Sequence, residues 1–204
     1  MKITNDNINI GILGLGYVGL PLAIEFGKKY LTIGFDTNQE RIKELGLSID
    51  RTNEVEKADF KDSQNLTFSS NIQDLSNCNI YIAAIPTPID ENNNPNLSLL
   101  RKCCESIAGI LKKGDIVVFE STVYPGTTEE ICVPILEKKS SLKYNTDFFC
   151  GYSPERINPG DKEHCLENVT KITSGSTNEI SIEIDNLYKS IITAGTYMAP
   201  SIKT

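Results

Sequence analysis

The sequence lacks an excess of basic residues. It has 20 Lys and Arg against 27 Asp and Glu in 204 residues, which gives a formal net charge of −7. A protein that binds nucleic acid through its phosphates presents clustered positive charge, and the chain shows no basic stripe. The composition therefore argues against nucleic acid as a partner, and the acidic balance bears mainly on solubility.

Long apolar runs and targeting segments are also missing. No stretch of about 18 apolar residues occurs, so no membrane span is predicted. The N-terminus, MKITNDNINI, is polar, and glycines interrupt the apolar run that follows it, so no signal peptide is predicted. These features favour a cytoplasmic protein without a membrane partner.

Cysteine-based frameworks are not indicated either. The six cysteines include no CxxC pair and are accompanied by a single histidine, His164. This pattern does not fit a zinc site, and no metal site is predicted. Without a secretion signal, reduced thiols are the expected state. The adjacent Cys103 and Cys104 are expected to be packing residues within a helix.

The residues that are present support a packed α/β fold. Hydrophobic residues make up 39% of the chain and charged residues 23%, which suits a globular core. Apolar runs alternate with helix-like segments, which predicts a Rossmann-like, doubly wound, mostly parallel sheet with helices on both faces. The expected strands are 9–13, 31–35, 66–69, 80–84, 116–119, 147–150, 171–174 and 195–199. The expected helices are 17–29, 38–45, 97–111, 127–138 and 178–190, and the polar stretch 48–63 is expected to be a surface loop.

A glycine-rich turn follows the first expected strand. Residues 14–19, GLGYVG, match the pattern G-x-G-x-x-G and open the first helix. In a dinucleotide-binding turn, Gly14 would permit the tight turn, Gly16 would let the backbone approach a pyrophosphate, and Gly19 would let helix and strand pack closely. The phosphates would lie against the free N–H groups at the N-terminus of the helix. The pattern therefore predicts a dinucleotide site.

An acidic residue ends the second expected strand. Asp36 lies 17 residues beyond Gly19, close to the roughly 20 expected of a carboxylate that binds the adenosine ribose. This carboxylate would repel a 2′-phosphate, so NAD is favoured over NADP as the cofactor. Arg41 could also meet a 2′-phosphate, and we interpret it as stacking on or flanking the adenosine. Asp36 could instead, or in addition, cap the helix that follows.

Two polar loops follow the next strands, at the edge where such sheets bind ligands. Thr87 lies in the segment PTP at 86–88 and could face the cofactor or simply belong to a rigid turn. Ser121 and Thr122 follow the strand 116–119 and offer hydroxyl groups. Thr127 and Thr128 could instead cap the next helix.

A third loop, SPERINPG, follows the strand 147–150 and contains Glu155. A carboxylate at this edge of the sheet could act as a general base or position a water molecule. It could equally form an ion pair or cap a helix. The residues alone leave these alternatives open.

Four motifs in order resemble those of a known family. They are GLGYVGLPLA (14–23), PTP (86–88), ESTVYPGTT (120–128) and SPERINPGDKEH (153–164). Together they resemble the UDP-glucose/GDP-mannose dehydrogenase family over essentially the whole chain. The resemblance is strongest to the branch acting on UDP-N-acetylhexosamines, including Vi-type and capsular polysaccharide enzymes. It implies oxidation of the 6-hydroxymethyl group of a UDP-sugar to a carboxylate, through a thiohemiacetal and a thioester, with two NAD per turnover.

The same resemblance implies roles for individual residues. Thr122 and Glu155 match positions thought to place the water that resolves the thioester. Arg156 and Ile157 match positions that contact the sugar nucleotide. Pro159 stands where the UDP-glucose branch usually has a second glutamate, which favours the acetamido-sugar branch. The positions that match cofactor contacts are Tyr17, Val18, Asp36, Arg41, Thr87 and Thr122.

The resemblance further implies a longer enzyme. The family's nucleophilic cysteine lies in a downstream motif like GFGG-x-C, and its catalytic lysine lies on a long central helix. Neither is matched in this sequence. We therefore expect residues 1–204 to be an NAD-binding Rossmann-like domain, the N-terminal part of an enzyme that forms homo-oligomers through the central helix. Two other hypotheses remain open: a different NAD-dependent dehydrogenase of the same architecture, and a non-catalytic NAD-binding module.

Overall fold

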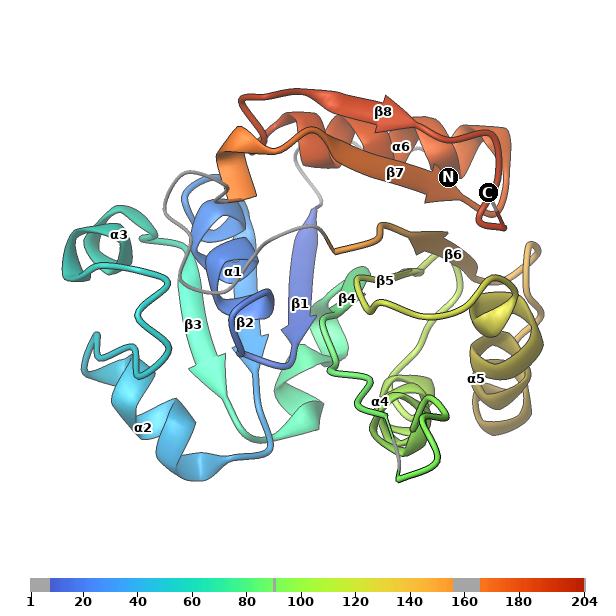
Figure 1. Cartoon of the computed structure of the whole chain (residues 1–204), viewed down its shortest axis with the longest axis horizontal. Coiled ribbons are helices and arrows are strands. Elements are labelled where there is room, and N and C mark those ends of the chain that lie inside the picture. Colours follow the sequence, from blue (N-terminus) through green and yellow to red (C-terminus); the bar gives the residue numbers. More distant parts are fainter. Residues whose placement is uncertain (1–7, 90, 156–165, 204) are drawn as a thin grey trace.

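One twisted sheet organises the protein (Figure 1). The computed structural model describes residues 8–89, 91–155 and 166–203. Within them the strand order is β3-β2-β1-β4-β5-β6-β7-β8, with β1 to β6 parallel, β7 antiparallel to β6, and β8 parallel to β7. The strands are β1 Asn9–Leu13, β2 Leu31–Phe35, β3 Leu66–Ser69, β4 Ile80–Ala83, β5 Ile116–Phe119, β6 Phe149–Tyr152, β7 Lys171–Gly175 and β8 Thr196–Met198. The order of the first six strands is that of the Rossmann fold, which confirms the predicted fold class.

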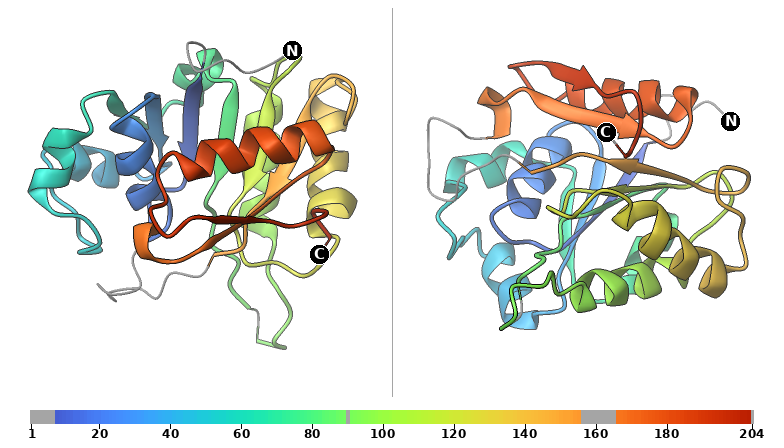
Figure 2. Two further views of the ribbon diagram at one scale, coloured as in Figure 1. Left: turned by 90° about the horizontal axis from the view of Figure 1, so that it is seen from above. Right: turned by 45° about the vertical axis from the view of Figure 1, so that its right-hand side comes forward.

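Helices cover both faces of this sheet (Figure 2). On one face α1 and α6 share a core cluster that includes Leu22 and Ile184, and Phe26 meets Tyr188 edge-on at 5.7 Å between ring centroids. On the other face α4 and α5 bury Leu100 and Leu136 in a second cluster. The helices are α1 Gly19–Gly27, α2 Gln39–Gly46, α3 Lys57–Asp62, α4 Ser98–Ala108, α5 Val133–Ser140 and α6 Asn178–Lys189. Within the described residues, none of these is long and apolar enough to cross a membrane.

Two local predictions were wrong. The stretch expected to be entirely loop contains α3, a short helix with no fully buried residue, in which the half-buried Phe60 packs against the core. Reciprocal capping between Glu56 and Asp59 also stabilises it. The helix expected over 127–138 is present, as a π-helical turn, Thr128–Cys132, that continues into α5, but the expected threonine cap is not. The Thr127 hydroxyl donates to the carbonyl of Tyr124 at 2.7 Å, and no side-chain cap forms there.

The cysteines within the described residues are buried free thiols. Cys103 and Cys104 lie in the cluster between the sheet and α4, which confirms their expected packing role. Burial raises the pKa of the Cys103 thiol to about 12, so this thiol is neutral near pH 7.

Candidate functional site

The glycine loop joins β1 to α1 with almost no spare space. Gly14 has a φ of +90°, and a Cβ atom built there would lie 2.6 Å from the carbonyl oxygen of Ala84. A Cβ atom on Gly19 would lie 1.8 Å from the carbonyl oxygen of Gly14. On Gly16 it would meet nothing within 4 Å. The turn therefore requires glycine at 14 and 19 for conformation and packing, as predicted, whereas Gly16 leaves open space above the backbone.

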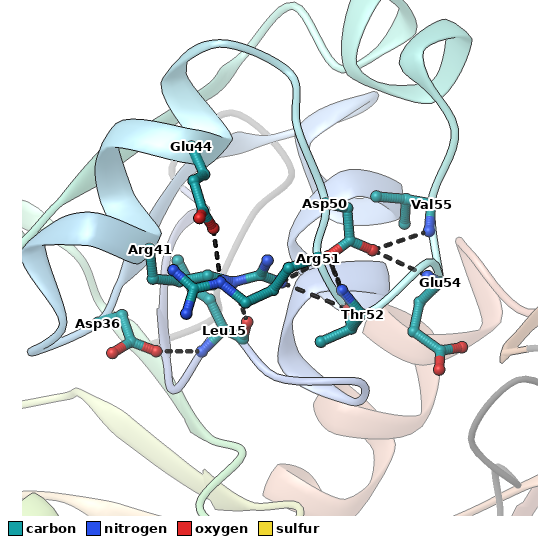
Figure 3. Close-up of polar contacts among 9 residues, drawn as sticks. All are labelled: Leu15, Asp36, Arg41, Glu44, Asp50, Arg51, Thr52, Glu54 and Val55. Atoms are coloured by element: carbon teal, nitrogen blue, oxygen red, sulfur yellow. Dashed lines mark hydrogen bonds and ion pairs between the residues drawn. The ribbon is translucent and has the colours of Figure 1, made fainter.

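Asp36, which directly follows β2, is hydrogen-bonded to this loop (Figure 3). One carboxylate oxygen accepts a hydrogen bond from the backbone N–H of Leu15 at 3.0 Å, and the other accepts from that of Asn38 at 2.9 Å. The cap of α2 is Asn38, whose side chain accepts from the backbone N–H groups of Glu40 and Arg41. The alternative that Asp36 itself caps the helix is therefore wrong.

Arg41 contacts the glycine loop through Leu15 (Figure 3). Its side chain is buried. Its Nε donates to the carbonyl of Leu15 at 3.0 Å, and its Nη2 pairs with Asp50 at 2.8 Å. Burial alone would raise the pKa of Asp50, but hydrogen bonds from Thr52, Arg41 and the backbone of Glu54 lower it. Arg41 is not among the residues that line either cavity, and its Nη1 is buried without a hydrogen-bond partner. Its expected contact with the adenosine stays a prediction.

Two cavities meet at the carboxyl edge of the sheet. The first, which we call the loop cavity, has a volume of about 490 Å³, and the second, the side cavity, has about 470 Å³. They share Gly14, Asp36, Ile85 and Pro86 as a common wall. Each volume falls in the range of roughly 300–1,000 Å³ typical of ligand sites. The loop cavity is also lined by residues 15–18, 84, 87–88, 120–122 and 155, and the side cavity by residues 13, 35, 37, 99, 102–103 and 106.

Most of the predicted cofactor residues line the loop cavity. They are Gly14, Gly16, Tyr17, Val18, Asp36, Thr87, Ser121 and Thr122, while Gly19 and Arg41 support the wall from behind.

Two side-chain hydroxyl groups form hydrogen bonds between the loop that follows β4 and the loop that follows β5. Thr87 donates to the carbonyl of Thr122 at 2.6 Å, and Ser121 donates to that of Ile85 at 2.6 Å. These hydroxyl groups can therefore offer a ligand only their lone pairs while both bonds persist.

Glu155 lines the loop cavity and contacts residues that the sequence analysis had not singled out. Its carboxylate lies 3.5 Å from the ammonium of Lys171, and that ammonium lies 2.6 Å from Glu120. Tyr188 donates its hydroxyl to the other oxygen of Glu120. The ion-pair alternative for Glu155 is thus confirmed. Glu120 directly follows the strand β5, and Lys171 is the first residue of β7. A charged residue at the end of a strand can be recognised in the sequence, so this pattern could have pointed to the ion pair.

The two predicted sugar-contacting residues, Arg156 and Ile157, lie outside the described residues, as does Pro159.

Comparisons with known proteins agree with this geometry. Residues 8–192 match the NAD binding domain of the UDP-glucose/GDP-mannose dehydrogenase family. A UDP-N-acetyl-D-glucosamine 6-dehydrogenase of Pseudomonas aeruginosa is 59% identical over 97% of this chain and 47% of its own length. One of Salmonella typhi is 53% identical over 97% and 47%. The structure of a UDP-D-ManNAc dehydrogenase from Pyrococcus horikoshii superposes with a TM-score of 0.87 at 30% identity, over 96% of this chain and 47% of that one.

The chain therefore spans about half the length of the curated relatives it matches. The family match covers most of its residues, and the glycine loop, the acid at the end of β2 and the strand order all agree with it. The chain belongs to the UDP-glucose/GDP-mannose dehydrogenase family, and it forms that family's NAD binding domain.

Proposed function

We propose that this chain binds NAD across the loop and side cavities, as part of an enzyme that oxidises the C6 hydroxymethyl group of a UDP-N-acetylhexosamine to a carboxylate. The main observation in support is that the two cavities adjoin each other, with Gly14 and Asp36 lining both. A pyrophosphate over Gly16 would leave the adenosine to the side cavity and the nicotinamide to the loop cavity. When bound, NAD supplies the hydride acceptor.

The residues present fit this cofactor. The open space at Gly16 lets the diphosphate approach the backbone at the start of α1, where free N–H groups favour an anion. Asp36 faces both cavities, so its carboxylate is placed to accept hydrogen bonds from ribose hydroxyls and to repel a 2′-phosphate. Apolar side chains of Leu13, Phe35 and Leu99 line the side cavity and suit an adenine ring.

The substrate class is supported by the names of the relatives. Two of them, at 59% and 53% identity, are UDP-N-acetyl-D-glucosamine 6-dehydrogenases, and a third, at 52%, is protein CapL of Staphylococcus aureus. We propose UDP-N-acetyl-D-glucosamine as the first substrate to test and surface polysaccharide synthesis as the setting. The buried free thiols suit a cytoplasmic enzyme.

Glu155 and Thr122 are the residues of this chain that we assign to the chemistry. Both line the loop cavity, and neither lines the side cavity. Glu155 would serve as a general base or place a water, and Thr122 would help to hold that water. We assign residues 1–204 to the NAD-binding part of the enzyme. Sugar oxidation is expected only when a segment equivalent to the remaining half of the relatives is joined to it.

We expect the wild-type chain to bind NAD⁺ with measurable heat in calorimetric titration and NADP⁺ much more weakly. The variant Asp36→Asn should lose about tenfold or more in NAD⁺ affinity, because hydrogen bonds to a charged acceptor contribute roughly 1.5–3 kcal/mol each. Its preference for NAD⁺ over NADP⁺ should shrink, since the repulsive charge is gone.

The control is Asp62→Asn, which removes the same charge from α3, an element that lines neither cavity. It should bind both nucleotides as the wild type does. Absence of NAD⁺ binding to the wild type at millimolar concentration would contradict the proposed function. Unchanged affinity in Asp36→Asn would contradict the role given to Asp36.

A further inference from the structure

Two neighbouring loops at the carboxyl edge of the sheet line the loop cavity. The first, which we call the β4 loop, comprises residues 85–88, and the second, the β5 loop, comprises residues 120–122. The β4 loop contains Pro86 and Pro88, which have no backbone N–H with which to hydrogen-bond a neighbouring loop. This leaves a larger share of the link between the two loops to side chains.

Two side-chain hydroxyl groups supply this link in opposite directions. Thr87 of the β4 loop donates to the carbonyl of Thr122 at 2.6 Å. Ser121 of the β5 loop donates to the carbonyl of Ile85 at 2.6 Å. Ser121 is only 3% exposed, so its hydrogen bond is largely shielded from water. Together the two bonds fix the spacing between the loops.

The position of the β4 loop affects both cavities. Ile85 and Pro86 belong to the common wall, so they line the side cavity as well as the loop cavity. Ile85 also lies against the glycine loop, since a Cβ atom built on Gly14 would be 3.1 Å from its Cδ1. Thr87 and Ser121, in contrast, line the loop cavity and are not among the residues that line the side cavity. Loss of either hydroxyl group would therefore reach the side cavity through a displacement of the common wall.

We propose that Thr87 and Ser121 are positioning residues, which hold the common wall in place and thereby set the fit of both halves of NAD. The inference rests on the proposed function and deepens it. On the proposed pose the adenosine takes the side cavity, which neither hydroxyl group lines. A loop that is already held in its bound conformation need not be ordered when the ligand binds, which favours affinity. Loss of either bond should therefore weaken binding of the adenosine half as well as of the whole dinucleotide.

The test measures dissociation constants on the purified chain for NAD⁺ and for 5′-AMP, which serves as the probe for the side cavity. NAD⁺ is titrated by calorimetry, and 5′-AMP by competition with NADH fluorescence. Thr87→Val removes one hydroxyl group and keeps the branched shape, and Ser121→Ala removes the other. Each variant should bind both ligands about two- to tenfold more weakly, the effect of one net hydrogen bond. Thr87→Ser keeps a hydroxyl group and should bind both ligands as the wild type does.

Ser190→Ala is the matched control. The Ser190 hydroxyl also donates to a carbonyl at 2.6 Å, that of Leu187. Ser190 directly follows α6 and is not among the residues that line either cavity, so this variant should bind both ligands as the wild type does. Circular dichroism shows whether each variant is folded. Thr87 is only half-buried, so Thr87→Val decides the matter if Ser121→Ala does not fold.

An unchanged affinity for 5′-AMP in the folded variants overturns the inference, because a direct contact with the nicotinamide half would weaken binding of NAD⁺ alone. The proposed function then stays intact. Binding of NAD⁺ but not of millimolar 5′-AMP to the wild type also overturns the inference, since the adenosine half would then not occupy the side cavity by itself. Failure of the wild type to bind NAD⁺ overturns the proposed function itself.

Discussion

Replacing Lys171 with methionine is expected to lower the free energy of unfolding by about 3–5 kcal/mol, the usual cost of removing one partner of a buried ion pair. The substitution keeps much of the side-chain volume but leaves Glu120 and Glu155 without their common cation. Urea denaturation followed by circular dichroism measures the change. For a chain of this length the melting temperature should fall by roughly 6–20 °C.

The pH dependence of that loss has a definite sign. Burial and the charge of Glu155 raise the pKa of Glu120, and Lys171 opposes that rise. Without Lys171, the pKa of Glu120 in the folded variant rises further above its unfolded value. A carboxyl group whose pKa is higher in the folded than in the unfolded state lowers the free energy of unfolding at pH values above its unfolded pKa of about 4.3. It has no such effect below that pH. The difference in free energy of unfolding between the wild type and the variant should therefore become smaller as the pH falls toward about 4.3.

A double variant serves as the control for Lys171→Met. Adding Glu120→Gln removes one of the stranded charges while Tyr188 can still donate to the amide oxygen, so at least half of the lost stability should return. A loss below about 1 kcal/mol in the single variant would match an exposed ion pair. That result would contradict the buried arrangement.

Replacing Gly19 with alanine is expected to damage both stability and NAD binding. The added Cβ would lie 1.8 Å from the carbonyl oxygen of Gly14 and 3.2 Å from the Cβ of Ala84, so α1 or the glycine loop must move. Overpacking of this kind costs about 1–3 kcal/mol and occasionally more. A displaced loop also loses two or more hydrogen bonds to the phosphates, which lowers NAD⁺ affinity by about 100-fold.

Gly16→Ala is the matched control, because it adds the same methyl group within the same loop. Nothing lies within 4 Å of that position and it lines the loop cavity, so the free energy of unfolding should stay near the wild-type value. The methyl group would still obstruct a diphosphate lying close to the backbone. Gly16→Ala should therefore weaken NAD⁺ binding without destabilising the fold. Equal stability for the two variants would show that the close contact at Gly19 can relax freely.

Several features of the site follow from local pattern. The glycine loop, the acid that ends β2 and the alternation of apolar strands with amphipathic helices involve neighbouring residues, so spacing alone predicts them. The same reasoning places Thr87, Ser121, Thr122 and Glu155 at one edge, because parallel strands present their carboxyl ends together.

Arg41 shows where local reasoning stops. Its spacing from Asp36 predicts contact with the adenosine, but it does not predict that the guanidinium also bonds to the carbonyl of Leu15 and to Asp50. A chain position near a site does not determine which way a long side chain points. The hydrogen-bonding groups available to it in three dimensions decide that, here a loop carbonyl and a buried carboxylate.

By itself, the sequence determined the class of fold, the position of the nucleotide loop and the family, since each is written in short, ordered motifs. Only the tertiary structure decided the charge behind the loop cavity. Glu120 and Lys171 are 51 positions apart, and Glu120 and Tyr188 are 68 apart. Their meeting depends on the antiparallel return of β7 against β6 and the packing of α6 on the sheet. Burial then makes each charge depend on its partners, which is a property of the assembled core and of no single segment.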